Sequence, residues 1–320
     1  MRKQLSVFAA PLAGISDTAY RFLAKHFGAD YAFTEMVSAE GLVRNNHRTI
    51  DMLKKYQGED AVGCQLFGSK PEVIAAAAEV VEAHGFDSID LNCGCPVHKV
   101  VKKNGGAGLL KNLPLLETII ATTVKKVNIP LSLKIRSGWD DNHLNFLEVG
   151  KVAEGAGAAF ICLHARTQSD KFKPESHWEH IAQLRETVSI PVIGNGGIRC
   201  AEDAINLMHQ TGCDAVMVAR ASFGNPFIFR EIKSLLADGW LTAPAGNEER
   251  VAICLEHVRL LVERFGEERA IRRSRKLLGW YCRRITSRAK IDQRLFRLNT
   301  FAEVEGYLNE LLATIQENAA

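Results

Sequence analysis

The first 240 residues alternate short β-branched runs with longer amphipathic runs, and this alternation constrains the fold more than any other feature. Eight runs have the length and composition of buried strands, at residues 7–10, 31–34, 62–66, 88–92, 131–135, 160–163, 192–194 and 215–218. Helical patterns separate them, among them residues 17–26, 71–84, 114–127, 144–154, 201–209 and 226–237. Eight strands that alternate with helices favour an α/β fold of the (β/α)8 TIM-barrel type over an open doubly wound sheet. The near-identical segments 127–130 and 188–191 indicate equivalent turns before strands five and seven.

The β pattern ends before Pro244-Ala245-Gly246-Asn247, a segment with the composition of a linker. Beyond it, residues 248–265, 268–284 and 300–316 all have helical periodicity. We therefore predict two domains. Residues 1–243 form the barrel, and residues 244–320 form a small C-terminal all-helical domain.

Composition excludes several classes of protein. With 47% hydrophobic and 24% charged residues among 320, the chain is typical of a globular protein with a sizeable core. No segment approaches the roughly 20 apolar residues that span a bilayer, and the first residues lack the apolar core of a secretory signal. We therefore expect a cytoplasmic monomer that does not bind membranes. Eight cysteines without framework spacing indicate reduced thiols rather than disulfides.

The positive charge is concentrated in one segment. Residues 269–297, here called the basic segment, hold eleven basic side chains and a single acid, Asp292. The net charge of +3 therefore divides into +10 for this segment and −7 for the rest of the chain. Exposed helices ordinarily mix charges of both signs, so a merely solvated face is a poor explanation. With Trp280 and Tyr281 among the arginines, the segment predicts contact with the phosphate backbone of a folded RNA.

Ligands of a TIM barrel bind where its strands end, and several strand ends carry unusual residues. Gly196 and Gly197 follow strand seven and Arg220 follows strand eight, as in the phosphate site of this fold. The alternative for the glycines is a plain tight turn. Lys134, near the end of strand five, could stabilise an anionic reduced flavin, or form a Schiff base as in barrel aldolases. Gln65 could hydrogen-bond the edge of a planar heterocycle, so the set favours a mononucleotide, most plausibly FMN.

Strand four ends in Asn92-Cys93-Gly94-Cys95-Pro96, which places two thiols at the barrel mouth. Zinc would need further ligands, and His98 alone does not complete a site, so we expect no metal. Core packing could explain Cys93. Cys95 lies past the strand, and an ordinary thiol, with a pKa of about 8.5, is mostly protonated at neutral pH. Cys95 is therefore the better candidate for a proton donor.

Strand six ends in His164-Ala165-Arg166-Thr167, and strand two ends near Glu35. A lone histidine is more often a core residue than a ligand, but its place at a barrel mouth favours a role in binding. Glu35 could accept from an imide N–H, or pair with a nearby arginine.

These strand ends resemble one family. The shared motifs are Ala10-Pro11-Leu12-Ala13-Gly14, Asn92-Cys93-Gly94-Cys95-Pro96, Leu133-Lys134-Ile135-Arg136, His164-Ala165-Arg166-Thr167, Asn195-Gly196-Gly197 and Ala219-Arg220-Ala221. Together they resemble the tRNA-dihydrouridine synthases, most of all the bacterial B-type branch, over essentially the whole chain. In two places the chain departs from the family pattern. Gly197 stands where an Asp is expected, and Cys93 where Met or another apolar residue is commoner.

The resemblance implies an FMN enzyme that uses NADPH to reduce uridines in tRNA. It implies that FMN is held by Pro11, Leu12, Ala13, Gln65, Lys134, His164, Asn195, Gly196, Gly197, Ala219 and Arg220. Cys95 would protonate C5 of the uracil after hydride reaches C6, and Asn92 would contact that base. To substrate binding we also assign Glu35, Arg136, Arg166, Arg272 and Arg273. A uracil in folded tRNA must be unstacked to reach a barrel pocket.

Two other functions remain open. A small-molecule flavin reductase, akin to dihydroorotate or dihydropyrimidine dehydrogenases, would share the barrel but would not explain the basic segment. A non-catalytic RNA-binding protein would bind tRNA without flavin, and the combination of Cys95, Lys134, His164 and Arg220 argues against it.

Overall fold

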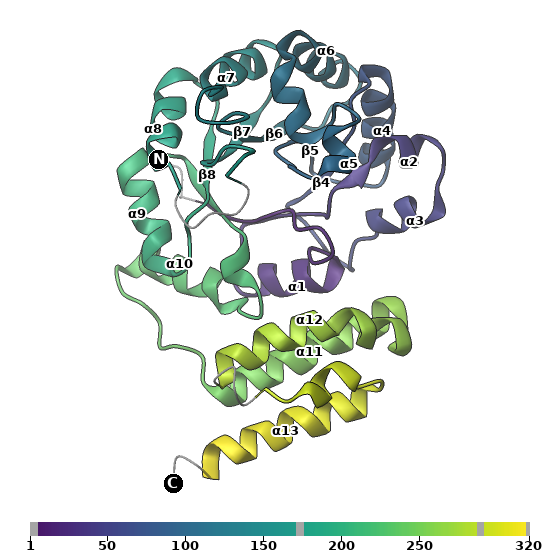
Figure 1. Ribbon diagram of the computed structural model, residues 1–320, viewed down its shortest axis with the longest axis vertical. Helices are drawn as coiled ribbons and strands as arrows, with labels where there is room; N and C mark the ends of the chain where they lie inside the picture. The colour runs from purple at the N-terminus through teal and green to yellow at the C-terminus, as the bar shows by residue number, and fades with distance from the viewer. Residues whose placement is uncertain (1–5, 171–175, 287–290, 318–320) are drawn as a thin grey trace.

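The computed structural model describes residues 6–170, 176–286 and 291–317. Its first part is a closed barrel of eight parallel strands surrounded by helices, as predicted (Figure 1). The barrel strands are β1 (Ser6–Ala9), β2 (Tyr31–Phe33), β4 (Val62–Phe67), β5 (Ser88–Cys93), β6 (Leu131–Arg136), β7 (Phe160–His164), β8 (Val192–Asn195) and β9 (Ala215–Val218). Pairing of β2 with β4 closes the ring. The two-residue strand β3 (Val37–Ser38) extends β4 and is too short to produce a sequence pattern.

The six helical segments named from the sequence of the barrel are all present, and four further helices, at residues 39–43, 47–50, 98–101 and 178–187, were not predicted. The surrounding helices are α1 (Thr18–His26), α2 (Ala39–Val43), α3 (His47–Ile50), α4 (Pro71–Ala83), α5 (His98–Val101), α6 (Leu113–Val124), α7 (Phe146–Gly155), α8 (Trp178–Thr187), α9 (Ala201–Thr211) and α10 (Phe227–Asp238). Local chemistry sets several ends. The Asp17 carboxylate caps α1 by accepting from the nitrogen of Tyr20 at 3.2 Å. Gly212, with φ of 63°, ends α9 in the left-handed conformation.

The two similar sequence segments form equivalent turns, as predicted. Glu82 at the end of α4 accepts from the main-chain nitrogens of residues 128 and 129, at 2.7 and 3.2 Å. Glu154 at the end of α7 accepts from those of residues 189 and 190 at the same two distances. In both turns one carboxylate satisfies two main-chain donors just before a strand begins.

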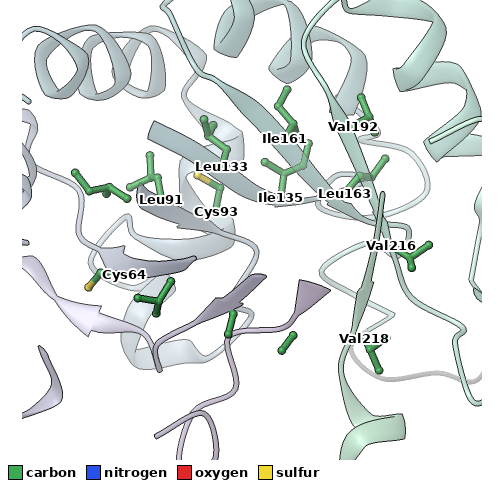
Figure 2. Packing of buried hydrophobic residues seen from close by; sticks show 14 of the residues in the cluster. Cys64, Leu91, Cys93, Leu133, Ile135, Ile161, Leu163, Val192, Val216 and Val218 are labelled. Carbon is green, nitrogen blue, oxygen red and sulfur yellow. The ribbon is translucent and has the colours of Figure 1, made fainter. Parts of the chain in front are cut away.

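Alternation along the strands separates two cores. Leu91, Cys93, Leu133, Ile135 and Leu163 belong to the buried cluster between strands and helices, and Figure 2 shows them together. Cys93 therefore packs in the core, as predicted. Inside the barrel, the rings of Phe8, Tyr31, Phe33 and Phe160 fill one end, with Phe8 and Tyr31 stacked at 5.3 Å. Toward the carboxyl ends of the strands, the inward positions become polar.

The C-terminal helices are α11 (Asn247–Phe265), α12 (Glu267–Ile285) and α13 (Phe301–Glu317). Helix α11 packs against α1, and α13 packs against α11 on the side away from the barrel (Figure 1). The three helices share a core of their own, which also includes Ala19 from α1. Trp280 of α12 stacks on Phe223, which follows β9, with ring centroids 4.2 Å apart. Gly224 allows this approach, because a Cβ atom there would lie 2.5 Å from the nitrogen of Tyr281. Two basic residues of the basic segment, Arg288 and Lys290, lie outside the described residues.

Candidate active site

A cavity of about 490 Å³ opens at the carboxyl ends of the barrel strands. Its volume lies within the roughly 300–1,000 Å³ of small-molecule sites. All eleven residues expected to hold FMN line it, namely Pro11, Leu12, Ala13, Gln65, Lys134, His164, Asn195, Gly196, Gly197, Ala219 and Arg220. Asn92, Cys95, Arg136 and Arg166 line it as well. Glu35 and Arg273 line a separate small pocket of about 70 Å³, and Arg272 lines neither.

The glycine turn after β8 requires both of its glycines. Gly196 and Gly197 have φ of 112° and 80°, which L side chains rarely adopt. A Cβ atom on Gly196 would lie 2.7 Å from Oγ of Ser176, and one on Gly197 would lie 2.9 Å from Nε1 of Trp178. Because the two glycines have no side chains, a ligand can approach their main chain closely. Together with Arg220, which lines the same cavity, this main chain suits a phosphate group. The space that an Asp at position 197 would need is taken by Trp178.

Lys134 is held at a fixed point on the cavity wall. Its Nζ donates to Oδ1 of Asn195 at 2.7 Å, and Nδ2 of Asn195 donates to the carbonyl of Met217 at 2.7 Å. The amide of Asn195 thereby links β6 to β9 across the barrel mouth. A cation anchored in this way fits beside a ring that becomes negatively charged on reduction.

His164 is neutral in this environment. Burial lowers the pKa of its imidazole well below the ordinary value, and the cations of Lys134, Arg136, Arg166 and Arg220 lower it further. Because Nη1 of Arg166 approaches Nε2 at 3.0 Å, the neutral ring accepts there and carries its proton on Nδ1.

Cys95 is half-buried at the edge of the cavity. Burial raises the pKa of its thiol, so the thiol is protonated at neutral pH. Hydrogen bonds hold the turn that carries it. Oδ1 of Asn92 accepts from the nitrogen of Cys95 at 2.9 Å, and Nε of Arg136 donates to the carbonyl of Gly94 at 2.8 Å. Arg136, predicted as a substrate contact, thus also supports this turn.

Glu35 is engaged by the protein itself. Its carboxylate accepts from the nitrogen of Gly14 and lies 3.6 Å from Nη2 of Arg273, which also approaches Asp17 at 3.4 Å. Of the two sequence hypotheses for Glu35, the structure therefore supports pairing with an arginine. Arg272 is exposed on α12 and pairs with Glu268 at 2.6 Å.

Some residues of the site were not singled out from the sequence. Asp90 does not line the cavity itself but lies buried inside the barrel, two residues before Asn92 on β5, and an Asp within an apolar strand was the available signal. Lys276 and Phe223 line the cavity, although Lys276 belongs to α12. Nothing in the sequence indicates that a side chain of α12 reaches the cavity formed by the strand ends. Within residues 6–170, 176–286 and 291–317, no cluster of side chains suited to a metal ion occurs. None of the helices in these ranges is long and apolar enough to cross a membrane.

Comparison with known proteins agrees with the resemblance predicted from the strand ends. The family model described as Dihydrouridine synthase (Dus) matches residues 8–320. The tRNA-dihydrouridine synthase B of Shewanella oneidensis is 37% identical over 322 residues, covering 98% of this chain and 97% of the relative. That of Pseudomonas aeruginosa is 38% identical over 273 residues, covering 85% and 82%. Histamine dehydrogenase from Rhizobium sp. 4-9, at 14% identity and a TM-score of 0.55, shares the fold over 71% of this chain and 45% of its own.

Proposed function

Because the chain belongs to the dihydrouridine synthase family, we propose that it reduces the C5=C6 bond of specific uridines in tRNA to 5,6-dihydrouridine. We propose FMN as its cofactor and NADPH as its reductant. The observation that carries the proposal is the meeting, in one cavity, of a glycine turn, the anchored Lys134 and the protonated thiol of Cys95.

The cavity lining suggests how FMN would be held. Gly196, Gly197 and Arg220 would bind the phosphate, and Lys134 and Gln65 would contact the ring. Pro11, Leu12, Ala13 and Ala219 would line the walls, with His164 and Asn195 as further polar contacts. When bound and reduced, FMN supplies the hydride that is added to C6.

The protein supplies the matching proton. Asn92 would hold the uracil, and the Cys95 thiol would donate its proton to C5, which leaves a thiolate that solvent reprotonates. Hydride and proton together saturate one double bond, so the two additions balance. The raised pKa of the Cys95 thiol supports this role, because the acid form is the one populated before the reaction.

We propose that residues 1–243 form the catalytic domain and that residues 244–320 form the tRNA-binding domain. Arg272 and Arg273 would contact the tRNA from α12, with Arg136 and Arg166 contributing at the barrel mouth and Glu35 helping to hold Arg273 in place. The net charge of +10 on the basic segment supports the assignment of tRNA binding to residues 244–320, since phosphate contacts supply a large share of the affinity for nucleic acid.

The substitution Cys95→Ala tests the proposal, with Cys200→Ala as control because Cys200 is exposed on the outside of the barrel. Purified Cys95→Ala protein should bind FMN and oxidise NADPH like wild type, yet form no dihydrouridine in tRNA. Full activity of this variant on tRNA would refute the role of Cys95. Comparing dihydrouridine positions in tRNA from cells with and without the protein would identify its target uridines. Equal turnover of free uridine and tRNA would favour the small-molecule reductase instead.

A further inference from the structure

A buried carboxylate lies at the start of a chain of hydrogen bonds that ends at Cys95. Asp90, on β5 and 1% exposed, points into the barrel. Its Oδ1 accepts from Oγ of Ser132 at 2.7 Å, and its Oδ2 accepts from Nε2 of Gln65 at 2.7 Å. An ionised carboxylate can only accept, so it decides which way round the Gln65 amide is oriented.

Two further hydrogen bonds, from Asn92 to Gln65 and from Cys95 to Asn92, depend on this orientation of the Gln65 amide. With its nitrogen turned to Asp90, Gln65 offers Oε1 to Nδ2 of Asn92 at 2.8 Å. Asn92 must then turn Oδ1 the other way, where it accepts from the nitrogen of Cys95 at 2.9 Å. Every bond from Cys95 back to Asp90 therefore has the same polarity. Gln65 and Asn92 are 2% and 8% exposed, so water cannot readily replace a missing partner.

Resting on the proposed function, we propose that Asp90 is a positioning residue whose charge orients the Gln65 and Asn92 amides toward the bound rings. In this orientation the donor end of the Asn92 amide is kept at the cavity lining, and its second N–H, whose nitrogen lies 4.0 Å from the weak acceptor Sδ of Met36, suits a uracil carbonyl oxygen. A reversed amide would present an acceptor instead and would release the nitrogen of Cys95. The Asp90 carboxylate thus determines both the donor that Asn92 offers to the base and the position of Cys95, although it contacts neither the base nor Cys95.

The charge is present under ordinary conditions. Burial raises the pKa of Asp90 to about 6, against the lowering effects of Gln65, Ser132 and Lys134, so the carboxylate is ionised at neutral pH. The nearest alternative is that Asp90 only stabilises the fold. That alternative predicts a lower melting temperature and an equal effect on both half-reactions.

The substitution Asp90→Asn keeps the shape but removes the acceptor-only character, so the two amides can reverse. We expect NADPH oxidation to fall at most a few-fold, through the contact of Gln65 with FMN, while single-turnover reduction of tRNA by the pre-reduced enzyme falls about tenfold or more. Ser132→Ala is the matched control, because it removes the other partner of Asp90 and leaves the relay through Gln65 intact. Its single-turnover rate, measured at about pH 8 because loss of the Ser132 bond raises the pKa of Asp90, should stay within a few-fold of wild type.

A second variant keeps the proposal testable if Asp90→Asn folds poorly. Asp90→Asn combined with Gln65→Glu moves the charge one step along the relay, so residue 65 still accepts from Asn92. We expect this pair to recover most of the single-turnover rate lost in Asp90→Asn. An unchanged rate in Asp90→Asn, or equal losses in both half-reactions with no recovery in the pair, would overturn the proposal. Wild-type protein inactive on tRNA would instead refute the proposed function itself.

Discussion

Gly106 packs directly against Cys95: a Cβ atom on Gly106 would lie 2.7 Å from the carbonyl oxygen of Cys95 and 3.1 Å from its Cβ. The next residue, Ala107, donates its nitrogen to that same carbonyl at 3.1 Å. The short helical turn η2 (Gly106–Lys111) is therefore the outer support of the residue that we assign as the acid.

The substitution Gly106→Ala should displace Cys95 without altering the FMN contacts. Since Gly106 also has φ of 57°, the alanine adds about 1–2 kcal/mol of backbone strain. We expect tRNA reduction to fall about tenfold or more, because small displacements of a reacting group are costly. FMN affinity, measured by flavin fluorescence, should remain unchanged.

Gly85→Ala is the control for the strain alone. Gly85 has φ of 72°, yet nothing lies within 4 Å of where its Cβ would be. This variant should lose a similar amount of stability and keep full activity. Equal loss of activity in both variants would show that strain, rather than contact with Cys95, is responsible.

The acid role of Cys95 predicts a pH profile. Burial raises the pKa of its thiol, so the reactive protonated form persists above about pH 8.5, the ordinary thiol range. Single-turnover reduction of tRNA should hold steady from neutral pH, where Asp90 is ionised, up to this raised value, and should fall as pH rises through it. NADPH oxidation should not share the alkaline fall. If Cys95→Ser keeps residual activity, that activity should not show the alkaline fall either. An alkaline fall that persists in Cys95→Ser would assign the titration to another group.

Lys276 predicts that α12 contributes to the cavity itself. Its ammonium lies 5.1 Å from the ring of Trp280, and it lines the cavity together with Cys95 and Arg220. We expect Lys276→Ala to raise KM for tRNA about tenfold and to reduce the salt slope of binding by about one. Lys151→Ala, an exposed lysine on α7, is the control and should change neither. A loss of FMN affinity in Lys276→Ala would assign the lysine to the cofactor phosphate instead.

The sequence predicted the barrel and most of the cavity for the same physical reason. Strands such as β5 and β6 show clear alternation, and the carboxyl ends of parallel strands converge on one mouth, so strand-end residues must meet. Cys95 and Lys134 could be named because each is chemically unusual for its position. Nothing in that reasoning depends on contacts between distant segments.

The features that the sequence did not predict depend on contacts between segments that are distant in the chain. The sequence allowed Glu35 to pair with an arginine but could not say which one, because Arg273 is far away in the sequence and reaches Glu35 through the docking of the C-terminal helices on the barrel. The role of Asp90 follows from amide orientations that side-chain identity does not specify. At position 197, the departure from the family pattern becomes intelligible only once Trp178 is seen beside it.

A buried histidine in the helical core predicts sensitivity to acid. Burial lowers the pKa of His257 to about 3, and its Nδ1 lies 3.3 Å from the hydroxyl of Tyr281. The unfolded chain has a histidine pKa of about 6.5, so between these values it binds a proton that the folded protein does not. The contribution of His257 to the free energy of unfolding is therefore fully present above pH 6.5. As pH falls below that value, the contribution is lost by about 1.4 kcal/mol per pH unit.

His257→Gln removes this proton and keeps a polar side chain. Between pH 7.5 and 5.0, the free energy of unfolding measured in urea should fall about 2 kcal/mol less in the variant than in wild type. His209→Gln is the control, because His209 is exposed on α9 and should leave the pH dependence as it is. If His257→Gln lost stability in acid as steeply as wild type, the carboxylates would have to account for the whole effect. The helical core would then be no more sensitive to acid than the barrel on which it packs.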